Sequence, residues 1–492
     1  MDKWVPAALD YIPRWLEYQM RQAEQPGCVI AVADQGRIAL EQAFGHADLD
    51  RRTKLTPRHR FRVASHSKSF TSAGIMKLRE QNRVRLDDPV GRYVDDLHSD
   101  VADATIAQIL SHSAGLVRDG WDSGQWQDRR PFLGAAELRA DLAAAPIIDA
   151  NTRFKYSNHG FGLAGMVTEA VTGERYTDWI KREIVVPARL KETEPDMPLP
   201  RGVPMARGHT GMLPAGRRFV IPGDNPTNAL APATGFISTA ADLVRFFGQL
   251  DPAAPRSVLS AASRREMVRR QWSDPYATFG SNYGLGIASG NTAGFDWFGH
   301  GGGFQGFITR TSALTGRGLA ISILTNAIDG WAHLWWGGIM QILATFSRHG
   351  AANARLRDWA GRWWTPWGAV DLVPMGKRVI VAAPGWLNPV MDATEIEVSG
   401  RDEGKIALAG GFANHGESVR RKRDRNGAVT EIWFGGGCLM PEDRVVRELK
   451  HRYGKKATGK ARSGARKNDV SRAATAPAAQ APRRAQADAA TR

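Results

Sequence analysis

The sequence is poor in cysteine and lacks long hydrophobic runs. Its 492 residues include only two cysteines, Cys28 and Cys438, and neither belongs to a Cys-x-x-Cys motif. Two cysteines in a chain of this length cannot build a disulfide framework. No segment approaches the roughly 18 to 20 uncharged apolar residues that a membrane-spanning helix needs. The sequence therefore excludes a disulfide-stapled scaffold and a helical membrane protein.

The amino-terminal segment also lacks the uninterrupted apolar stretch of a signal peptide. Asp2, Asp10 and Arg14 break every candidate run, and the apolar residues between them recur at helical spacing. We therefore expect an amino-terminal helix and a soluble, cytoplasmic protein.

The positive charge is concentrated at the carboxyl terminus. The formal net charge is +16, but twelve of the 66 Lys and Arg residues and two of the 50 Asp and Glu residues lie from Lys450 onward, which leaves +6 for the rest. The segment 450–492 has almost no large aliphatic residues and cannot offset its ordering entropy by burial, so we expect it to be disordered. Nucleic-acid contact through this basic segment is the less favoured interpretation.

The remaining sequence alternates between strand-like and helical patterns, typical of a mixed α/β fold. Strands are expected at 28–33 and 38–44, a long helical block follows, and strands return at 304–312 and 319–325. The expected parts in chain order are a split sheet domain (1–80 and 281–349), a mostly helical insertion (81–280), a Trp-rich connector (350–369), a small β module (370–449) and the basic tail (450–492).

Ser65 and Lys68 form the single Ser-x-x-Lys sequence of the chain. Positions i and i+3 of a helix share a face, so the amine can lie beside the hydroxyl. A lysine that burial or nearby positive charge keeps neutral can take the serine proton and create a nucleophile. A serine that only caps a helix would give the same pattern, so this motif alone does not establish a catalytic site.

Two further motifs could complete an acyl-transfer site. Tyr156-Ser-Asn158 is the single Tyr-x-Asn; its phenol can exchange a proton with Ser65, although a packed surface turn would look the same. The glycines of His300-Gly-Gly-Gly303 let a substrate approach the backbone of an edge strand, where an N–H can face an oxyanion. His209-Thr-Gly211 also fits His-x-Gly but lies in the Gly- and Pro-rich segment 204–222, so we favour His300.

Together, the order and spacing of these motifs resemble those of serine β-lactamases and penicillin-binding proteins. Tyr156 follows Ser65 by 91 residues, and the His-x-Gly motif lies where the strand patterns resume. Three supporting phrases are also similar: Leu86-Asp-Asp-Pro-Val90, Ile109-Leu-Ser-His-Ser-Ala-Gly-Leu116 and Ala231-Pro-Ala-Thr-Gly-Phe-Ile-Ser-Thr-Ala-Ala-Asp-Leu243. The likeness covers roughly residues 10–348. It is greatest to class C β-lactamases, D-aminopeptidases, DD-peptidases and family VIII-type esterases.

This resemblance implies a β-lactamase/transpeptidase-like fold, in which an antiparallel sheet is flanked by helices and carries a mostly helical insertion. It also implies roles for individual residues: Ser65 as nucleophile, Lys68 and Tyr156 as proton-transfer partners, Asn158, His300 and Gly302 as substrate-binding residues, and the backbone N–H groups of Ser65 and Gly303 as oxyanion hole. It leaves open whether Lys68 or Tyr156 is the acylation base.

His300 departs from the Lys-Thr-Gly of β-lactamases and most penicillin-binding proteins. That lysine is a fixed cation for a substrate carboxylate, whereas a histidine is charged only part of the time near neutral pH. The departure weakens the case for penicillin turnover and favours peptides, amides or esters.

We therefore expect a serine hydrolase that acts through an acyl-enzyme on amide or peptide bonds, bonds of D-amino acids included. A carboxylesterase is the main alternative; a β-lactamase or a catalytically silent binding protein is a weaker one. The expected partner is a small-molecule or peptide substrate. No cofactor or metal is expected, because the chain has no His-Glu-x-x-His or His-x-His motif. The oligomeric state is not indicated.

Overall fold

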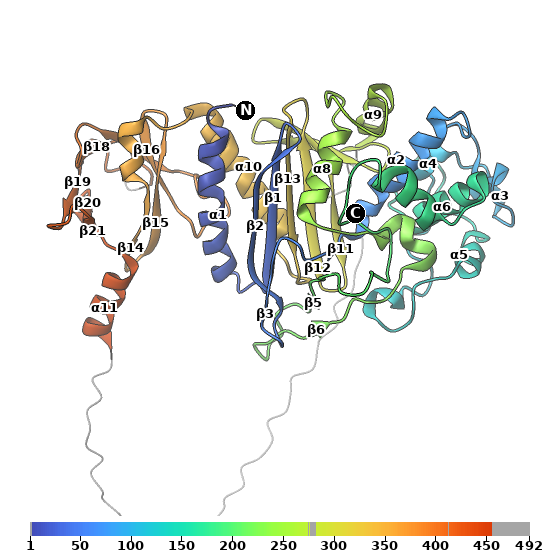
Figure 1. Ribbon diagram of the computed structural model, residues 1–492, viewed down its shortest axis with the longest axis horizontal. Helices are drawn as coiled ribbons and strands as arrows, with labels where there is room; N and C mark the ends of the chain where they lie inside the picture. Colours follow the sequence, from blue (N-terminus) through green and yellow to red (C-terminus); the bar gives the residue numbers. More distant parts are fainter. Residues whose placement is uncertain (1, 274, 276–281, 412, 455–492) are drawn as a thin grey trace, which may run out of the picture. The chain divides into compact units, whose positions relative to one another are not determined.

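A nine-stranded antiparallel sheet forms the centre of the protein (Figure 1). The computed structural model describes residues 2–273, 275, 282–411 and 413–454. The strand order is β3-β2-β1-β13-β12-β11-β10-β9-β8. The strands are β1 (Gly27–Asp34), β2 (Arg37–Asp48), β3 (Thr53–Lys54), β8 (Trp272–Ser273), β9 (Asn282–Tyr283), β10 (Ala288–Thr292), β11 (Phe295–Phe304), β12 (Phe307–Leu314) and β13 (Leu319–Thr325). Because β1 pairs with β13 along its length, the sheet joins two segments that lie almost 300 residues apart in the sequence.

Helices cover both faces of this sheet. Helices α1 (Val5–Gln22) and α10 (Ala332–His349) pack together on one face, and α8 (Ala240–Leu250) covers the other (Figure 1). Every residue of β1 is buried as a result, which explains its nearly continuous apolar sequence.

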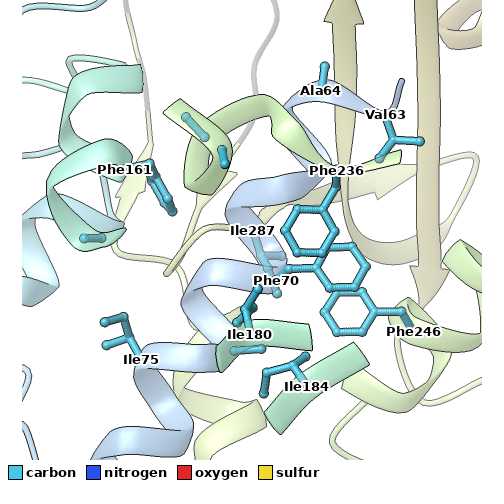
Figure 2. Packing of buried hydrophobic residues seen from close by; sticks show 14 of the residues in the cluster. Val63, Ala64, Phe70, Ile75, Phe161, Ile180, Ile184, Phe236, Phe246 and Ile287 are labelled. Atoms are coloured by element: carbon cyan, nitrogen blue, oxygen red, sulfur yellow. The ribbon is translucent and has the colours of Figure 1, made fainter. Parts of the chain in front are cut away.

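The helical lobe lies beyond α8 and surrounds helix α2 (Ser67–Glu80). Its other helices are α3 (Ser99–Ala102), α4 (Ile106–Leu110), α5 (Ala135–Leu142), α6 (Asn158–Thr172), α7 (Tyr176–Ile180) and α9 (Ala261–Val268). The Phe70 ring of α2 is stacked between Phe236 and Phe246, with centroids 4.3 and 3.8 Å away (Figure 2). Such buried aromatic stacking fixes the position of α2 relative to the sheet.

The carboxyl-terminal strands form a second antiparallel sheet with the simple order β14 to β21. They are β14 (Gly361–Thr365), β15 (Gly368–Met375), β16 (Arg378–Ala382), β17 (Thr394–Val398), β18 (Glu403–Leu408), β19 (Ser418–Arg423), β20 (Val429–Phe434) and β21 (Gly437–Leu439). Trp364 and Met440 exchange two backbone hydrogen bonds, which join the last strand to the first. An eight-stranded barrel of this kind is just wide enough for side chains to fill it. Its interior holds Leu372, Val379, Ile396, Ile406, Val419 and Ile432.

This barrel packs against α1 and α10, on the face of the central sheet opposite to α8. Val373 and Ile380 of the barrel belong to one buried apolar cluster with Trp15 and Trp335. Gln19 is fully buried in this contact; its amide donates to the carbonyl of Pro384 at 2.7 Å. The back of the sheet is therefore covered by helices and then by the barrel.

The predicted mixed α/β class with an antiparallel sheet flanked by helices is confirmed. Three details differ from the expected segments. The strand expected at 304–312 is interrupted, because Gly306, with φ of +80°, forms a turn between β11 and β12. The expected connector 350–369 contains β14, so the barrel begins within it.

The third difference concerns the carboxyl terminus. Residues 450–453, assigned to the basic tail, belong to helix α11 (Glu442–Tyr453). The rest of the expected disordered tail, 455–492, lies outside the described residues. In the described part of the chain, no helix combines the length and apolar character needed to cross a bilayer.

Replacing Trp15 tests the packing of the barrel on α1. Trp15 is fully buried and its indole N–H donates to the carbonyl of Trp386 at 3.2 Å. Trp15→Ala should lower the free energy of unfolding by about 3–5 kcal/mol because it leaves a cavity. Trp367→Ala is the control, since Trp367 is 96% exposed and should cost little. Urea unfolding followed by circular dichroism measures both; equal stabilities of the two variants would contradict this packing.

Candidate active site

Ser65 lies at the turn that leads from β4 (Phe61–Arg62) into α2. The preceding residue, Ala64, has a left-handed φ of +49°, which is uncommon for a residue with a side chain. Residues 61–64 and 66–70 are all buried, whereas Ser65 is partly exposed. Ser65 is therefore the one partly exposed residue of an otherwise buried segment.

Lys68 lies one helical turn after Ser65 and is fully buried. Its Nζ is 3.2 Å from Ser65 Oγ, 2.7 Å from Asn158 Oδ1 and 2.9 Å from the carbonyl oxygen of Ala233. Burial holds the pKa of Lys68 well below the usual lysine range, because a charged amine is poorly solvated there. The amine is thus surrounded by three oxygen atoms from separate segments of the chain.

Tyr156 approaches Ser65 from the loop before α6. Its hydroxyl donates to Ser65 Oγ at 2.9 Å. The next residue, Ser157, caps α6 by accepting from the N–H of Gly160 at 2.8 Å, and Asn158 begins the helix. Burial raises the pKa of Tyr156, so its phenol keeps its proton. The cap therefore fixes the tyrosine and the asparagine on either side of Lys68.

Strand β11 offers a free edge beside this group. Among the described residues, its pairing with β10 ends at Gly299, and the backbone of residues 300–304 pairs with β12 alone. Gly302 packs directly against the turn that carries Ser65: a Cβ there would lie 2.2 Å from the carbonyl oxygen of Val63. Gly303 is exposed, and a Cβ at that position would meet no atom closer than 3.5 Å. Gly302 therefore permits close packing, and Gly303 leaves its backbone accessible.

His300 is buried and makes two hydrogen bonds within the protein. Nδ1 lies 2.6 Å from the carbonyl oxygen of Gly301, which can only accept, so Nδ1 carries the proton. Nε2 then accepts from the Tyr283 hydroxyl at 3.0 Å. Burial and the nearby Lys68 keep the pKa of His300 well below the usual histidine range. His300 is therefore a neutral ring whose two nitrogens are already engaged.

Three residues that were not singled out from the sequence also line the site. Asp119 accepts from Asn158 Nδ2 at 2.6 Å, and Tyr283 binds His300. The His112 ring lies 4.1 Å from the ring of Tyr156 and accepts from the N–H of Ser157 at 3.1 Å. His112 falls inside one of the supporting phrases, but Asp119 and Tyr283 carry no distinctive spacing, so only the fold identifies them.

The alternative histidine, His209, has a structural role, because both of its ring nitrogens bind backbone groups. Its Nδ1 donates to the carbonyl of Asn326 at 2.7 Å and its Nε2 accepts from the N–H of Leu49 at 3.3 Å.

Within residues 2–273, 275, 282–411 and 413–454, no group of three or more His, Cys, Asp or Glu side chains could hold a metal ion. Ser65, Lys68, Tyr156 and Asn158 are in direct hydrogen-bond contact, and His300 and Gly302 lie beside them.

Comparison with curated proteins gives partial matches. Protein flp of Staphylococcus aureus (strain MW2) is 26% identical over 182 residues, 36% of each chain. Penicillin-binding protein 4* of Bacillus subtilis (strain 168) is 29% identical over 170 residues, 34% of this chain and 37% of that protein. The chain thus spans little more than a third of the length of these curated relatives.

Solved structures show a similar fold over a larger part of the chain. The octameric penicillin-binding protein homologue from Pyrococcus abyssi superposes with a TM-score of 0.61 at 20% identity, over 88% of this chain and 99% of that one. A D-stereospecific amidohydrolase from Streptomyces sp. gives 0.55 at 25% identity, over 65% and 94%. D-amino acid amidase from Ochrobactrum anthropi SV3 with D-phenylalanine gives 0.57 at 22% identity, over 68% and 97%.

A family-level match covers most of the part of the chain that builds this site. The family model described as Beta-lactamase matches residues 12–330, which include Ser65, Lys68, Tyr156 and His300. Because this match extends over well more than half of the 492 residues, the chain belongs to the beta-lactamase family.

Proposed function

We propose that this protein is a serine hydrolase that acts through an acyl-enzyme on Ser65 and cleaves amide or peptide bonds, bonds of D-amino acids included. The observation that carries the proposal is the environment of the Ser65 hydroxyl. Lys68 Nζ lies 3.2 Å away and Tyr156 OH 2.9 Å away, and Ser65 is partly exposed among buried neighbours. A nucleophile with a base on one side and a proton donor on the other is what acyl transfer requires.

The hydrogen bonds of Lys68 favour it as the general base. Asn158 Oδ1 and the carbonyl oxygen of Ala233 can only accept, so they use the two N–H bonds of a neutral amine. The lone pair is then left for the hydroxyl proton of Ser65. Burial lowers the pKa of Lys68 and raises that of Tyr156, so the neutral amine and the neutral phenol are both favoured. We therefore assign the base to Lys68 and the proton donor to Tyr156.

Acylation then follows from these assignments. Lys68 takes the proton from Ser65 as Oγ bonds to the substrate carbonyl carbon, and the backbone N–H groups of Ser65 and Gly303 stabilise the oxyanion. Tyr156 gives its proton to the leaving nitrogen or oxygen as the bond to carbon breaks, and the proton on Lys68 restores the phenol. A water molecule then attacks the ester on Ser65 and reverses the proton transfers.

The neutral ring of His300 favours one class of substrate. His300 is neutral and its hydrogen bonds are made to Gly301 and Tyr283, so it supplies no cation for a carboxylate. This supports substrates whose leaving group is uncharged and argues against β-lactamase activity as the main one. Similarity to a D-stereospecific amidohydrolase and a D-amino acid amidase supports amides of D-amino acids.

A carboxylesterase is the second candidate, and the same neutral His300–Tyr283 pair favours it, because a simple ester carries no charge on its leaving group. The catalytic residues would keep the same roles. Turnover of D-phenylalanine p-nitroanilide compared with p-nitrophenyl butyrate separates the two candidates. An ester preference of several orders of magnitude would assign the protein to the esterases.

Replacing Ser65 should remove the covalent chemistry. Ser65→Ala should reduce turnover on the order of 10³-fold or more, as other nucleophile deletions do. A fluorophosphonate should add its mass to the peptide that contains Ser65 in the unaltered protein and not in Ser65→Ala. Ser399→Ala, an exposed serine of the barrel segment, is the control and should label normally. If the unaltered protein forms no adduct, a catalytically silent binding protein becomes the better interpretation.

The activity should depend on pH through Lys68. A base acts only when deprotonated, so kcat/KM should rise as Lys68 loses its proton and fall as pH drops through its pKa. Because burial lowers that pKa, the plateau should begin far below the usual lysine range. Lys68→Arg should abolish turnover, since a guanidinium stays protonated. Lys77→Arg, on the same helix, should keep the profile of the unaltered protein; activity retained in Lys68→Arg would exclude Lys68 as base.

Introducing a cation at position 300 should change substrate preference. N-acetyl-D-alanyl-D-alanine and its carboxamide differ only in the terminal charge, so the ratio of their kcat/KM values isolates recognition of a carboxylate. His300→Lys should raise the ratio in favour of the carboxylate about fivefold, the size of a modest ion pair. Tyr283→Phe removes the hydroxyl bound to His300 without adding charge and should leave the ratio unchanged. An unchanged ratio in His300→Lys would contradict the argument from charge.

A further inference from the structure

Asp119 has no part in the acylation steps, yet it is bonded to the residue that holds Lys68. It lies in the loop between α4 and α5. Its Oδ1 accepts from Asn158 Nδ2 at 2.6 Å and from the indole N–H of Trp126 at 3.0 Å. Arg118 Nε lies 3.4 Å from Oδ2, and the Asp119 side chain is only 11% exposed. The side-chain amide of Asn158 thus bridges a largely buried carboxylate and the Lys68 amine.

The loop that carries Asp119 is fastened to the start of α6. The carbonyl of Arg118 accepts from the N–H of Asn158 at 2.9 Å, and the Ser157 hydroxyl donates to the carbonyl of Val117 at 2.6 Å. Asp119 therefore keeps a fixed position relative to Asn158.

The first consequence is the orientation of the Asn158 amide. A carboxylate can only accept, so it binds the NH₂ end of the amide and turns the oxygen toward Lys68, at 2.7 Å. The reverse orientation would face an N–H toward the amine and remove one of the two acceptors that hold it. Asp119 therefore selects the arrangement in which the lone pair of Lys68 faces Ser65.

The second consequence is electrostatic. The negative charge of Asp119 raises the pKa of Lys68 and opposes the larger effect of burial. General-base catalysis needs an amine that is deprotonated but still has a high affinity for a proton, because a base weakened too far transfers protons slowly. Asp119 thus keeps Lys68 from becoming too weak a base.

The other groups around Lys68 do not supply this charge. Arg118 lowers the pKa of Lys68. Burial holds the pKa values of His112 and His300 well below the usual histidine range, so both rings are neutral. Tyr156 is a neutral phenol because burial raises its pKa. Asp119 is therefore the carboxylate whose charge acts on the amine.

We propose that Asp119 is a positioning residue that keeps Lys68 competent as a base, by orienting Asn158 and by placing a negative charge one amide away. This inference rests on the proposed function, in which Lys68 accepts the proton of Ser65.

The test measures the rate of fluorophosphonate labelling of Ser65 against pH, together with kcat and KM on D-phenylalanine p-nitroanilide. Asp119→Asn keeps a hydrogen-bonding side chain of the same shape and removes the charge. Asp119→Ala removes both, and Asp119→Glu keeps the charge. Asp122→Asn is the matched control, because Asp122 belongs to the same loop, is 68% exposed and binds Gly124 and Arg130.

In Asp119→Asn the acidic midpoint of labelling should move to lower pH by on the order of one unit, as expected for losing a charge at this separation. Asp119→Ala should show the same shift and a plateau lower by about tenfold, through kcat rather than KM. Asp119→Glu should restore the midpoint, and Asp122→Asn should match the unaltered protein.

Equal midpoints in Asp119→Asn and the unaltered protein would overturn the inference while leaving the proposed function intact. So would an effect confined to KM, because the carboxylate would then bind substrate rather than act through Asn158. Absence of Ser65 labelling in the unaltered protein would instead overturn the proposed function and this inference with it.

Discussion

The burial of the Lys68 amine is the constraint on which the arrangement of the site depends. A buried ammonium is costly unless it is paired or gives up its proton, so the protein must either neutralise the amine or surround it with acceptors. Three oxygens from separate segments of the chain surround the amine, and burial lowers its pKa. Two successive carbonyls of the π-helical turn Ala231–Gly235 accept hydrogen bonds from side chains of α2. Lys68 binds the carbonyl of Ala233, and the Thr71 hydroxyl binds that of Pro232 at 2.6 Å. Short π-helical segments often occur at functional sites.

The same constraint explains why the hydrophobic packing around α2 matters for chemistry. Hydrogen bonds of 2.7 to 3.2 Å from one amine to three segments require that these segments keep their relative positions. The stack of Phe70 between Phe236 and Phe246 links α2 to the segment after the π-helical turn and to α8 (Figure 2). Gly302 brings β11 against Val63 on the other side, where any side chain would collide with the carbonyl. Apolar packing thus positions polar atoms to within hydrogen-bond distance.

Much of the fold was predictable from local sequence, and much of the site was not. The expected strands at 28–33 and 319–325 correspond to β1 and β13, because strand burial follows residue pattern directly. The break at Gly306 was missed because Gln305-Gly306 is a turn of only two residues between strand-like residues on both sides. Ser65, Lys68, Tyr156 and Asn158 were identifiable because their motifs have fixed short spacings.

Asp119 and Tyr283 had no such signal. Each is hydrogen-bonded to a partner from another segment, Asn158 and His300 respectively, and only tertiary structure brings these pairs together. The charge state of His300 was likewise beyond the sequence, because it depends on burial and on the carbonyl of Gly301. A single sequence therefore does not identify site residues whose place depends on tertiary contacts rather than on a local motif.

The attachment of the barrel to α1 and α10 has a consequence for how this architecture can diversify. The barrel contacts the layer behind the central sheet, whereas Ser65 and its partners lie on the side of α2 and α8. Substitutions in the barrel can therefore accumulate without altering the surroundings of Ser65. Removal of the barrel, however, would expose the apolar surface around Trp15 and Trp335. A relative without the barrel would need polar residues on that surface, so gain or loss of the barrel is coupled to changes in α1 and α10 rather than to changes around Ser65.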